Sequence, residues 1–277
     1  MRTPTAILLY LLIIFLAGGC VGFFEQEVEL DELPFERRLV LNTILSPQDS
    51  LIRADVFVTA PAVGDLPSDY PRGGVVREAQ VRLENSSGSF PFEFQQTSAG
   101  FTYVLRQTEV QLETGQTYEV IAEWDGLTAR GEAAIPELSI PRESIMLTVV
   151  DGDQEQRTFA TWPNQIGERD YYHLFVDQIP QRGFGGDLQR NTVDYIYGRD
   201  ALGPEITSDN LGSPSGGGLE RTLNICQTTQ ATYEYFLTRG ILSVNDENPF
   251  AEPTTVANNL QEGLGLVGAS NCWQIQL

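Results

Sequence analysis

The chain has 277 residues, of which 38 are acidic and 17 are basic, so its formal net charge at pH 7 is −21. This charge argues against nucleic acid and against anionic membrane surfaces as partners, because both bind basic protein faces. One histidine and three cysteines are too few for a multi-histidine or four-thiolate metal site, and we expect neither a metal nor a cofactor.

The first segment in chain order resembles a bacterial lipoprotein signal. Arg2 is followed by an unbroken apolar run, Ala6–Ala17. This run has the length of a signal-peptide core and is too short to span a hydrocarbon layer of ~30 Å. Two glycines then precede Cys20, as in the lipobox whose cysteine is lipidated after cleavage. We therefore expect a signal peptide over residues 1–19 and lipidation of Cys20, which anchors the protein to a membrane of the cell envelope. An ordinary secretion signal is the alternative.

Residues 20–36 are rich in acidic side chains, among them Glu25, Glu27 and Glu29. Like charges on a short segment repel one another and extend the chain. We therefore expect an acidic tether over residues 20–36, followed by the first folded domain.

Residues 37–137 are predicted to form an N-terminal β-sandwich domain. Apolar and polar residues alternate in seven short segments, and the pair Asp125-Gly126 is typical of a two-residue hairpin turn. This density of strands is that of an immunoglobulin-like sandwich, with a loop at Ala60–Gly74. The predicted strands are Arg38–Leu45, Ala54–Thr59, Val75–Leu83, Phe90–Gln95, Phe101–Arg106, Thr117–Trp124 and Thr128–Ile135.

Residues 138–277 are predicted to form a C-terminal β-rich domain after a linker at Pro136–Pro141. A Gly-, Pro- and Ser-rich loop is predicted over Asp200–Gly218. The fold class is therefore predicted as all-β, with two tandem immunoglobulin-like β-sandwich domains and one short helix in the second. The predicted strands of this domain are Ile145–Val150, Thr158–Trp162, Tyr171–Val176, Val193–Tyr197, Leu219–Cys226 and Thr254–Ala257.

The single helix is predicted over Gln230–Arg239. Tyr233 and Phe236 fall on one face of it, Thr228 or Thr229 can cap its start, and Gly240 suits its end.

Cys226 and Cys272 are the two cysteines that remain once Cys20 is acylated. An even pair in an exported protein normally oxidises, so we expect a disulfide that ties the strand before the helix to a C-terminal strand. Two buried thiols are the alternative.

No residue is assigned a catalytic role. His173 is the only histidine, and no Gly-x-Ser-x-Gly elbow accompanies it, so we interpret it as a strand histidine among aromatic residues. The segment Asp151–Glu155 begins like a calcium loop but lacks the glycine and glutamate that an EF-hand requires, so we interpret it as a turn with solvated carboxylates. A looser calcium site remains an alternative.

Several motifs together resemble those of a known family. They are Gly126-x-x-Ala129, Ala133-x-Ile135-Pro136, Tyr171-Tyr172, Asn248-Pro249-Phe250-x-Glu252-Pro253, Asn259-Leu260 and Gly263-Leu264-Gly265-Leu266-x-Gly268-Ala269. The chain is similar to the uncharacterised Bacteroidota lipoproteins known as domain of unknown function 4249. The resemblance implies an all-β envelope lipoprotein, often encoded beside TonB-dependent outer-membrane receptors, without known enzyme activity.

The C-terminal motif is either a structural corner or a contact site. Its candidate residues are Asn248, Pro249, Phe250, Glu252, Pro253, Asn259, Gly263 and Gly265. Glycines at strand ends usually serve the backbone, which favours the structural interpretation.

Two classes of function stay open. We favour a non-catalytic outer-membrane lipoprotein that serves as an accessory or binding partner of a TonB-dependent receptor, with contacts from the loops Ala60–Gly74 and Asp200–Gly218. The alternative is a surface carbohydrate-active or hydrolytic enzyme built on carboxylates. Because acidic residues are abundant throughout the chain, no catalytic pair can be singled out.

Overall fold

The computed structural model describes residues 35–61, 64–97, 100–151, 156–164, 170–180, 189–198, 203–213, 219–245 and 255–277. The described residues fall into two units, of which one holds residues 35–36, 61 and 64–68, without helix or strand, and the other holds the described residues of 37–60 and 69–277. The predicted signal peptide, Cys20 and nearly all of the predicted tether lie outside the described residues.

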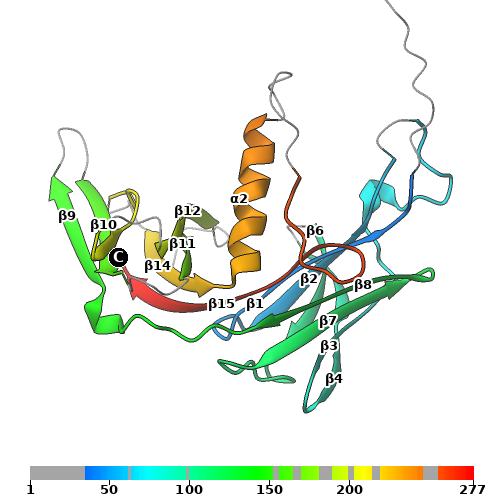
Figure 1. Cartoon of the computed structure of the whole chain (residues 1–277), viewed down its shortest axis with the longest axis horizontal. Coiled ribbons are helices and arrows are strands. Elements are labelled where there is room, and N and C mark those ends of the chain that lie inside the picture. Colours follow the sequence, from blue (N-terminus) through cyan, green and yellow to red (C-terminus); the bar gives the residue numbers. More distant parts are fainter. Residues whose placement is uncertain are drawn as a thin grey trace, which may run out of the picture. The chain divides into compact units, whose positions relative to one another are not determined.

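The largest sheet has eight strands in the order β12-β11-β14-β15-β1-β2-β6-β5 (Figure 1). The first half of β15 pairs parallel with β1, from Val40 opposite Leu264 onwards. Its second half pairs antiparallel with β14. One strand therefore belongs to both parts of the sheet. The eight strands are β1 (Leu39–Leu45), β2 (Leu51–Val58), β5 (Glu93–Thr97), β6 (Gly100–Arg106), β11 (Tyr171–Pro180), β12 (Gln189–Tyr197), β14 (Leu219–Thr228) and β15 (Leu264–Gln276).

A second sheet has four strands in the order β4-β3-β7-β8. Its hairpin between β7 and β8 turns at Asp125 and Gly126, whose φ angles of 49° and 75° are both positive, as a two-residue hairpin turn requires. This confirms the predicted turn. The four strands are β3 (Gln80–Asn85), β4 (Gly88–Pro91), β7 (Thr117–Trp124) and β8 (Leu127–Ala134), and a 3₁₀ turn, η1 (Arg72–Gly74), precedes them.

A third sheet has three strands in the order β13-β10-β9. These strands are β9 (Met146–Asp151), β10 (Gln156–Pro163) and β13 (Glu205–Thr207), and the 3₁₀ turn η2 (Arg142–Ser144) leads into β9. With one helix, α2 (Gln230–Asn245), the described part of the chain is all-β with a single short helix, as predicted.

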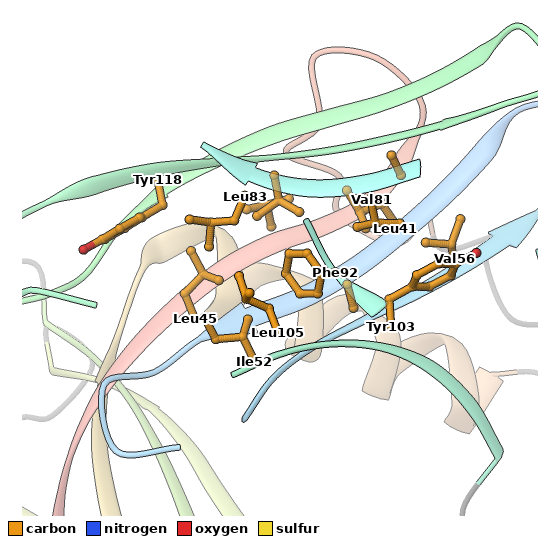
Figure 2. Close-up of a cluster of buried hydrophobic side chains, with 14 of the residues drawn as sticks. Leu41, Leu45, Ile52, Val56, Val81, Leu83, Phe92, Tyr103, Leu105 and Tyr118 are labelled. Carbon is orange, nitrogen blue, oxygen red and sulfur yellow. The ribbon is translucent and has the colours of Figure 1, made fainter. Parts of the chain in front are cut away.

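The first hydrophobic core lies between the four-stranded sheet and β1, β2, β6 and the first half of β15 (Figure 2). Alternate residues of β1 and β2 are buried, as expected of strands with one face in a core. Tyr103 is buried in this core, and its hydroxyl donates a hydrogen bond to the Val76 carbonyl at 3.0 Å and accepts one from the Ala79 N–H at 2.8 Å. The buried hydroxyl of Tyr103 therefore has both a hydrogen-bond acceptor and a hydrogen-bond donor.

The second core lies between the three-stranded sheet and β11 and β14. Trp162 of β10 packs edge-on against Tyr172 of β11, with ring centroids 5.5 Å apart. The second core is built from residues after the boundary predicted at residue 137, but the first core combines residues before that boundary with Leu260, Val267 and Ala269. The strand β15 contributes to both cores, through Val267 in the first and Ile275 against the second.

Four local predictions are wrong, and tertiary contacts explain two of them. The strand predicted from Val75 begins only at Gln80. The strand predicted over Phe90–Gln95 divides at Phe92, which is buried in the first core and whose N–H donates to the Val81 carbonyl at 2.9 Å, so that β4 and β5 join different sheets.

The other two errors lie around the helix. Of the strand predicted over Thr254–Ala257, the described residues 255–257 form no strand, and the Ala257 N–H donates to Thr238 Oγ1 of α2 at 2.8 Å instead. The helix continues through Gly240 to Asn245, because a helical glycine with open space around it costs only ~1 kcal/mol. Thr229 is the N-cap, since its Oγ1 accepts the Thr232 N–H at 3.3 Å.

The first turn of the helix α2 packs against the large sheet at Gly268 of β15. A Cβ atom on residue 268 would lie 2.4 Å from Thr232 Oγ1, so only glycine lets the first turn of α2 approach β15 this closely. Among the described residues, no helix has both the length and the apolar character needed to cross a bilayer.

Candidate functional site

An aromatic cluster lies between β11, β12 and α2. The His173 ring stacks on Tyr195 with centroids 4.4 Å apart, and Phe236 of α2 stacks on Tyr195 at 5.2 Å. Tyr171 stacks on Tyr197 at 4.7 Å. These contacts hold one flank of α2 against the sheet. The aromatic cluster consists of Tyr171, His173, Tyr195, Tyr197, Tyr233 and Phe236.

His173 is neutral within this cluster. Burial lowers its pKa to about 4, and the positive charge of Arg190 acts in the same direction. Its Nε2 lies 3.4 Å from Thr192 Oγ1. This is the environment of a strand histidine among aromatic residues, as the sequence predicts.

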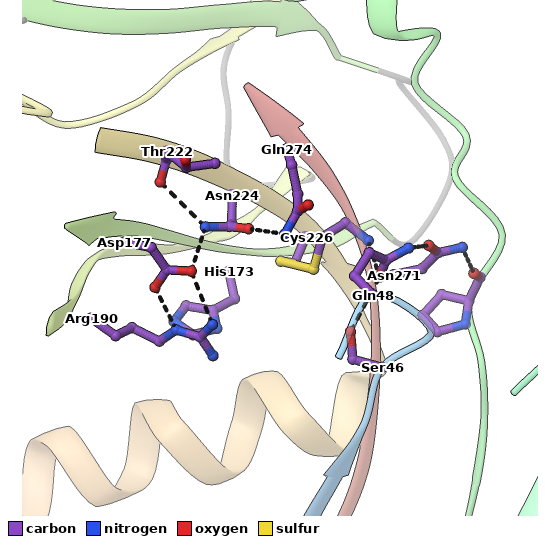
Figure 3. Close-up of a disulfide and its surroundings, with 12 residues drawn as sticks. Ser46, Gln48, His173, Asp177, Arg190, Thr222, Asn224, Cys226, Asn271 and Gln274 are labelled. Atoms are coloured by element: carbon purple, nitrogen blue, oxygen red, sulfur yellow. Dashed lines mark hydrogen bonds and ion pairs between the residues drawn. A yellow bond between two sulfur atoms is a disulfide. The ribbon is translucent and has the colours of Figure 1, made fainter. Parts of the chain in front are cut away.

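A hydrogen-bonded network surrounds Asp177 beside the cluster (Figure 3). Arg190 donates to both carboxylate oxygens of Asp177, from Nε at 2.8 Å and from Nη2 at 3.1 Å. Asn224 Nδ2 donates to Asp177 Oδ2 at 3.2 Å. The Arg190 guanidinium also lies 4.0 Å from the centroid of the Phe175 ring. The Arg190 guanidinium is therefore held both by the Asp177 carboxylate and by the face of the Phe175 ring.

A disulfide joins Cys226 of β14 to Cys272 of β15, the pair that the sequence singles out. The two residues are direct neighbours in the antiparallel register. Phe175 packs against both, and the bridge lies beside the network around Asp177 (Figure 3).

The turn between β1 and β2 is fastened to β15. Gln48 Nε2 donates to Asn271 Oδ1 at 2.8 Å, and the Cys272 N–H donates to Gln48 Oε1 at 3.1 Å. This attachment holds the neighbouring Asp49 beside the sheet.

Between α2 and the outer face of β1 and β2 lies a cavity of about 590 Å³, which we call the α2 groove. Its sheet side carries Asp49, Arg53 and Asp55, and its helix side carries Tyr235 and Arg239. Ile44, Phe57 and Leu266 supply apolar surface. This volume lies within the range of pockets for small ligands, and the lining is more polar than in most of them.

Within the described part of the chain, the charged side chains of the α2 groove form no ion pairs or hydrogen bonds with protein groups, whereas Arg37, Arg82, Arg130 and Arg190 each pair with a carboxylate elsewhere. Burial raises the pKa of Asp49, although Arg190 and Arg53 oppose that shift. In the part of the chain that the structure describes, the groove therefore presents charges of both signs that no ion pair or hydrogen bond ties down, although Arg53 and Arg190 act on Asp49 through space.

The strand β9 forms an exposed apolar edge. All six of its residues are exposed, and Met146, Leu147, Val149 and Val150 have 54%, 37%, 48% and 48% of their surface accessible. Exposed apolar surface of this kind marks protein or membrane contacts. In the described part of the chain, β9 pairs only with β10, so its outer edge is open.

The C-terminal motif is structural where it is described. Asn259 Nδ2 donates to the Val267 carbonyl at 2.8 Å, and Asn259 Oδ1 accepts the Val267 N–H at 3.0 Å. A Cβ on Gly263 would lie 2.7 Å from the Ala129 Cβ, and one on Gly265 would lie 2.2 Å from the Leu41 carbonyl oxygen. These residues let β15 pack closely on β1. Asn248, Pro249, Phe250, Glu252 and Pro253 lie outside the described residues.

The remaining candidates are placed only in part. Asp151 Oδ1 accepts a hydrogen bond from Gln156 Nε2 at 3.0 Å, and the rest of the segment interpreted as a turn lies outside the described residues. Among the residues that are described, no group of three or more potential ligands could hold a metal ion.

Comparison with known proteins gives a family but no activity. No curated protein matches the chain. A chain of a solved structure titled "Cytokine receptor complex - Crystal form 1A" covers 70% of this chain and 86% of its own length at 11% identity, with a TM-score of 0.25. At that score the likeness carries no argument. The pattern of the family "Domain of unknown function (DUF4249)" matches residues 25–275. The chain belongs to this family.

Proposed function

We propose that the protein is a lipoprotein of the outer membrane, anchored through Cys20, that acts by docking to a TonB-dependent receptor. The observation that carries the docking role is the exposed apolar strand β9. A sheet edge of this kind accepts an extended segment of another protein as an additional strand. The receptor enters as the partner that the family resemblance implies.

The backbone of β9 is suited to this pairing. Ser208 donates its N–H to the Ala160 carbonyl at 2.9 Å, so Ala160 of β10 faces away from β9. Because successive residues of an antiparallel strand point their N–H and C=O groups to opposite sides, Phe159 faces β9, where Thr148 lies opposite. Leu147 and Val149 therefore direct their backbone groups to the open edge.

A photocrosslinking amino acid at Leu147 tests this docking in native outer membranes. We expect a product that contains a TonB-dependent receptor, identified by mass spectrometry. The same amino acid at Ser87, in the exposed turn of the four-stranded sheet, should give none. A second variant, Val149→Pro, removes an outward N–H and should lower the crosslinking yield about tenfold, whereas Val149→Thr keeps that N–H and should not.

Failure to recover a receptor from position 147, together with turnover of a glycan or peptide by the pure protein, would replace the docking role with an enzymatic one. Equal yields for Val149→Pro and Val149→Thr would show that β9 does not pair with the partner strand.

The lipid anchor has its own test. Cys20→Ala should move the protein from the membrane fraction to the soluble fraction and abolish metabolic labelling with a fatty acid, because acyl chains contribute ~0.8 kcal/mol per buried CH₂. Unchanged membrane retention of this variant would contradict the anchor without bearing on β9.

A further inference from the structure

We propose that the α2 groove binds a short peptide that carries both a free ammonium group and a free carboxylate. The groove is distinct from the β9 edge, and this proposal does not rest on the receptor as partner. It rests on the shape of the groove, on the balance of its charges and on its apolar surface.

The charge balance excludes a ligand of one sign. Arg53 and Arg239 face Asp49 and Asp55 around the same cavity, so the groove is neutral in a chain whose formal charge is −21. An anion would be attracted to the arginines but repelled by the carboxylates. A cation would be attracted to the carboxylates but repelled by the arginines. A zwitterion can satisfy both signs at once.

The free charges of the groove also favour a charged ligand over a neutral one. Asp49 is partly desolvated, and in the described part of the chain Arg53 and Arg239 form no close ion pair with a carboxylate, although Arg53 acts on Asp49 through space. A closely fitting neutral ligand such as a saccharide would displace water from these charges without compensating them. A carboxylate can accept a bidentate pair of hydrogen bonds from an arginine, and an ammonium can donate to an aspartate.

The remaining surface of the groove suits peptide side chains. Phe57 lies on β2 beside Asp55, Leu266 lies opposite Asn42 across β15 and β1, and Tyr235 lies on the helix. The Phe236 ring is held by the aromatic cluster, so the wall that α2 provides is rigid on its inner flank. Apolar side chains between the two termini of a peptide would contact this surface.

Equilibrium dialysis of the full-length protein in detergent tests the proposal, with retained compounds identified by mass spectrometry. The probes are an equimolar pool of tripeptides with apolar central residues and free termini, the same pool with acetylated and amidated termini, and maltotriose. We expect retention of free tripeptides and at least about tenfold weaker retention of the blocked pool, because charge-assisted hydrogen bonds are lost.

Three variants locate the site. Arg53→Gln, Asp55→Asn and Arg239→Gln should each weaken tripeptide binding by about tenfold or more. Arg82→Gln is the matched control, because Arg82 pairs with Glu123 in the four-stranded sheet and lies outside the groove. Unchanged thermal melting of the groove variants would show that binding, and not folding, has changed.

The proposal is overturned if no tripeptide of the pool is retained, or if free and blocked tripeptides are retained equally. It is also overturned if maltotriose binds and the groove variants abolish that binding, because the ligand would then be a saccharide. Weaker binding in Arg82→Gln to the same degree would remove the groove as the site.

Discussion

Reduction of the disulfide between Cys226 and Cys272 is expected to lower the free energy of unfolding by about 4 kcal/mol. The bridge closes a span of 46 residues. In the chain-entropy model, a cross-link of this length removes that much conformational freedom from the unfolded chain. For a chain of this size the melting temperature should fall by about 10 °C, which calorimetry with and without reductant would measure.

The double variant Cys226→Ala and Cys272→Ala is the control for this effect. It should melt at or below the temperature of the reduced protein, because it also loses sulfur atoms that pack against Phe175, and reductant should not change its melting. If the reduced and oxidised proteins melt at the same temperature, the bridge does not constrain the unfolded state in the way described.

Acid is expected to destabilise the protein through His173. The pKa of this histidine falls from 6.5 in the unfolded chain to about 4 in the fold, so between these values the unfolded state binds a proton that the folded state does not. Stability is therefore complete above about pH 6.5 and is lost progressively as the pH falls to about 4. The loss from this group should reach up to about 3 kcal/mol, measured by urea denaturation at both ends of this range.

The variant His173→Phe keeps an aromatic ring in the stack and removes the titrating nitrogen. It should lose less stability than the wild type over the same pH range, by the amount assigned to His173. The raised pKa of Asp49 acts in the opposite direction, because its folded state binds a proton first, but it is present in both proteins and cancels in the comparison. Equal losses in the two proteins would contradict the linkage.

Features set by neighbouring residues could be predicted from the sequence. The turn at Asp125-Gly126 and the start of α2 beside Thr229 depend on backbone angles and capping groups a few residues apart. The bounds of β15 could not be predicted, because its glycines and small residues weaken the strand pattern. The need for glycine at these positions is seen only in the fold, where Gly265 lies against β1 and Gly268 lies against α2.

The α2 groove could not be predicted for a related reason. Its charged residues come from β2, from the turn before it and from α2, which lies far along the chain. In the sequence alone, each of them looks like an ordinary solvated side chain. The strand β9 was predicted over Ile145–Val150, but its exposure was not. The run Met-Leu-Thr-Val-Val lacks the alternation that separates a buried face from an exposed one.

The parallel pairing of β15 with β1 also constrains the order in which the protein can mature. β1 pairs with β2 early in synthesis, but its other edge finds its partner only when β15 has been made, so this edge of the eight-stranded sheet stays open until then. Contacts this distant in sequence form slowly, and an open sheet edge invites pairing with other chains meanwhile. The free edge of β1 is therefore exposed to such pairing until the C-terminal strand is available.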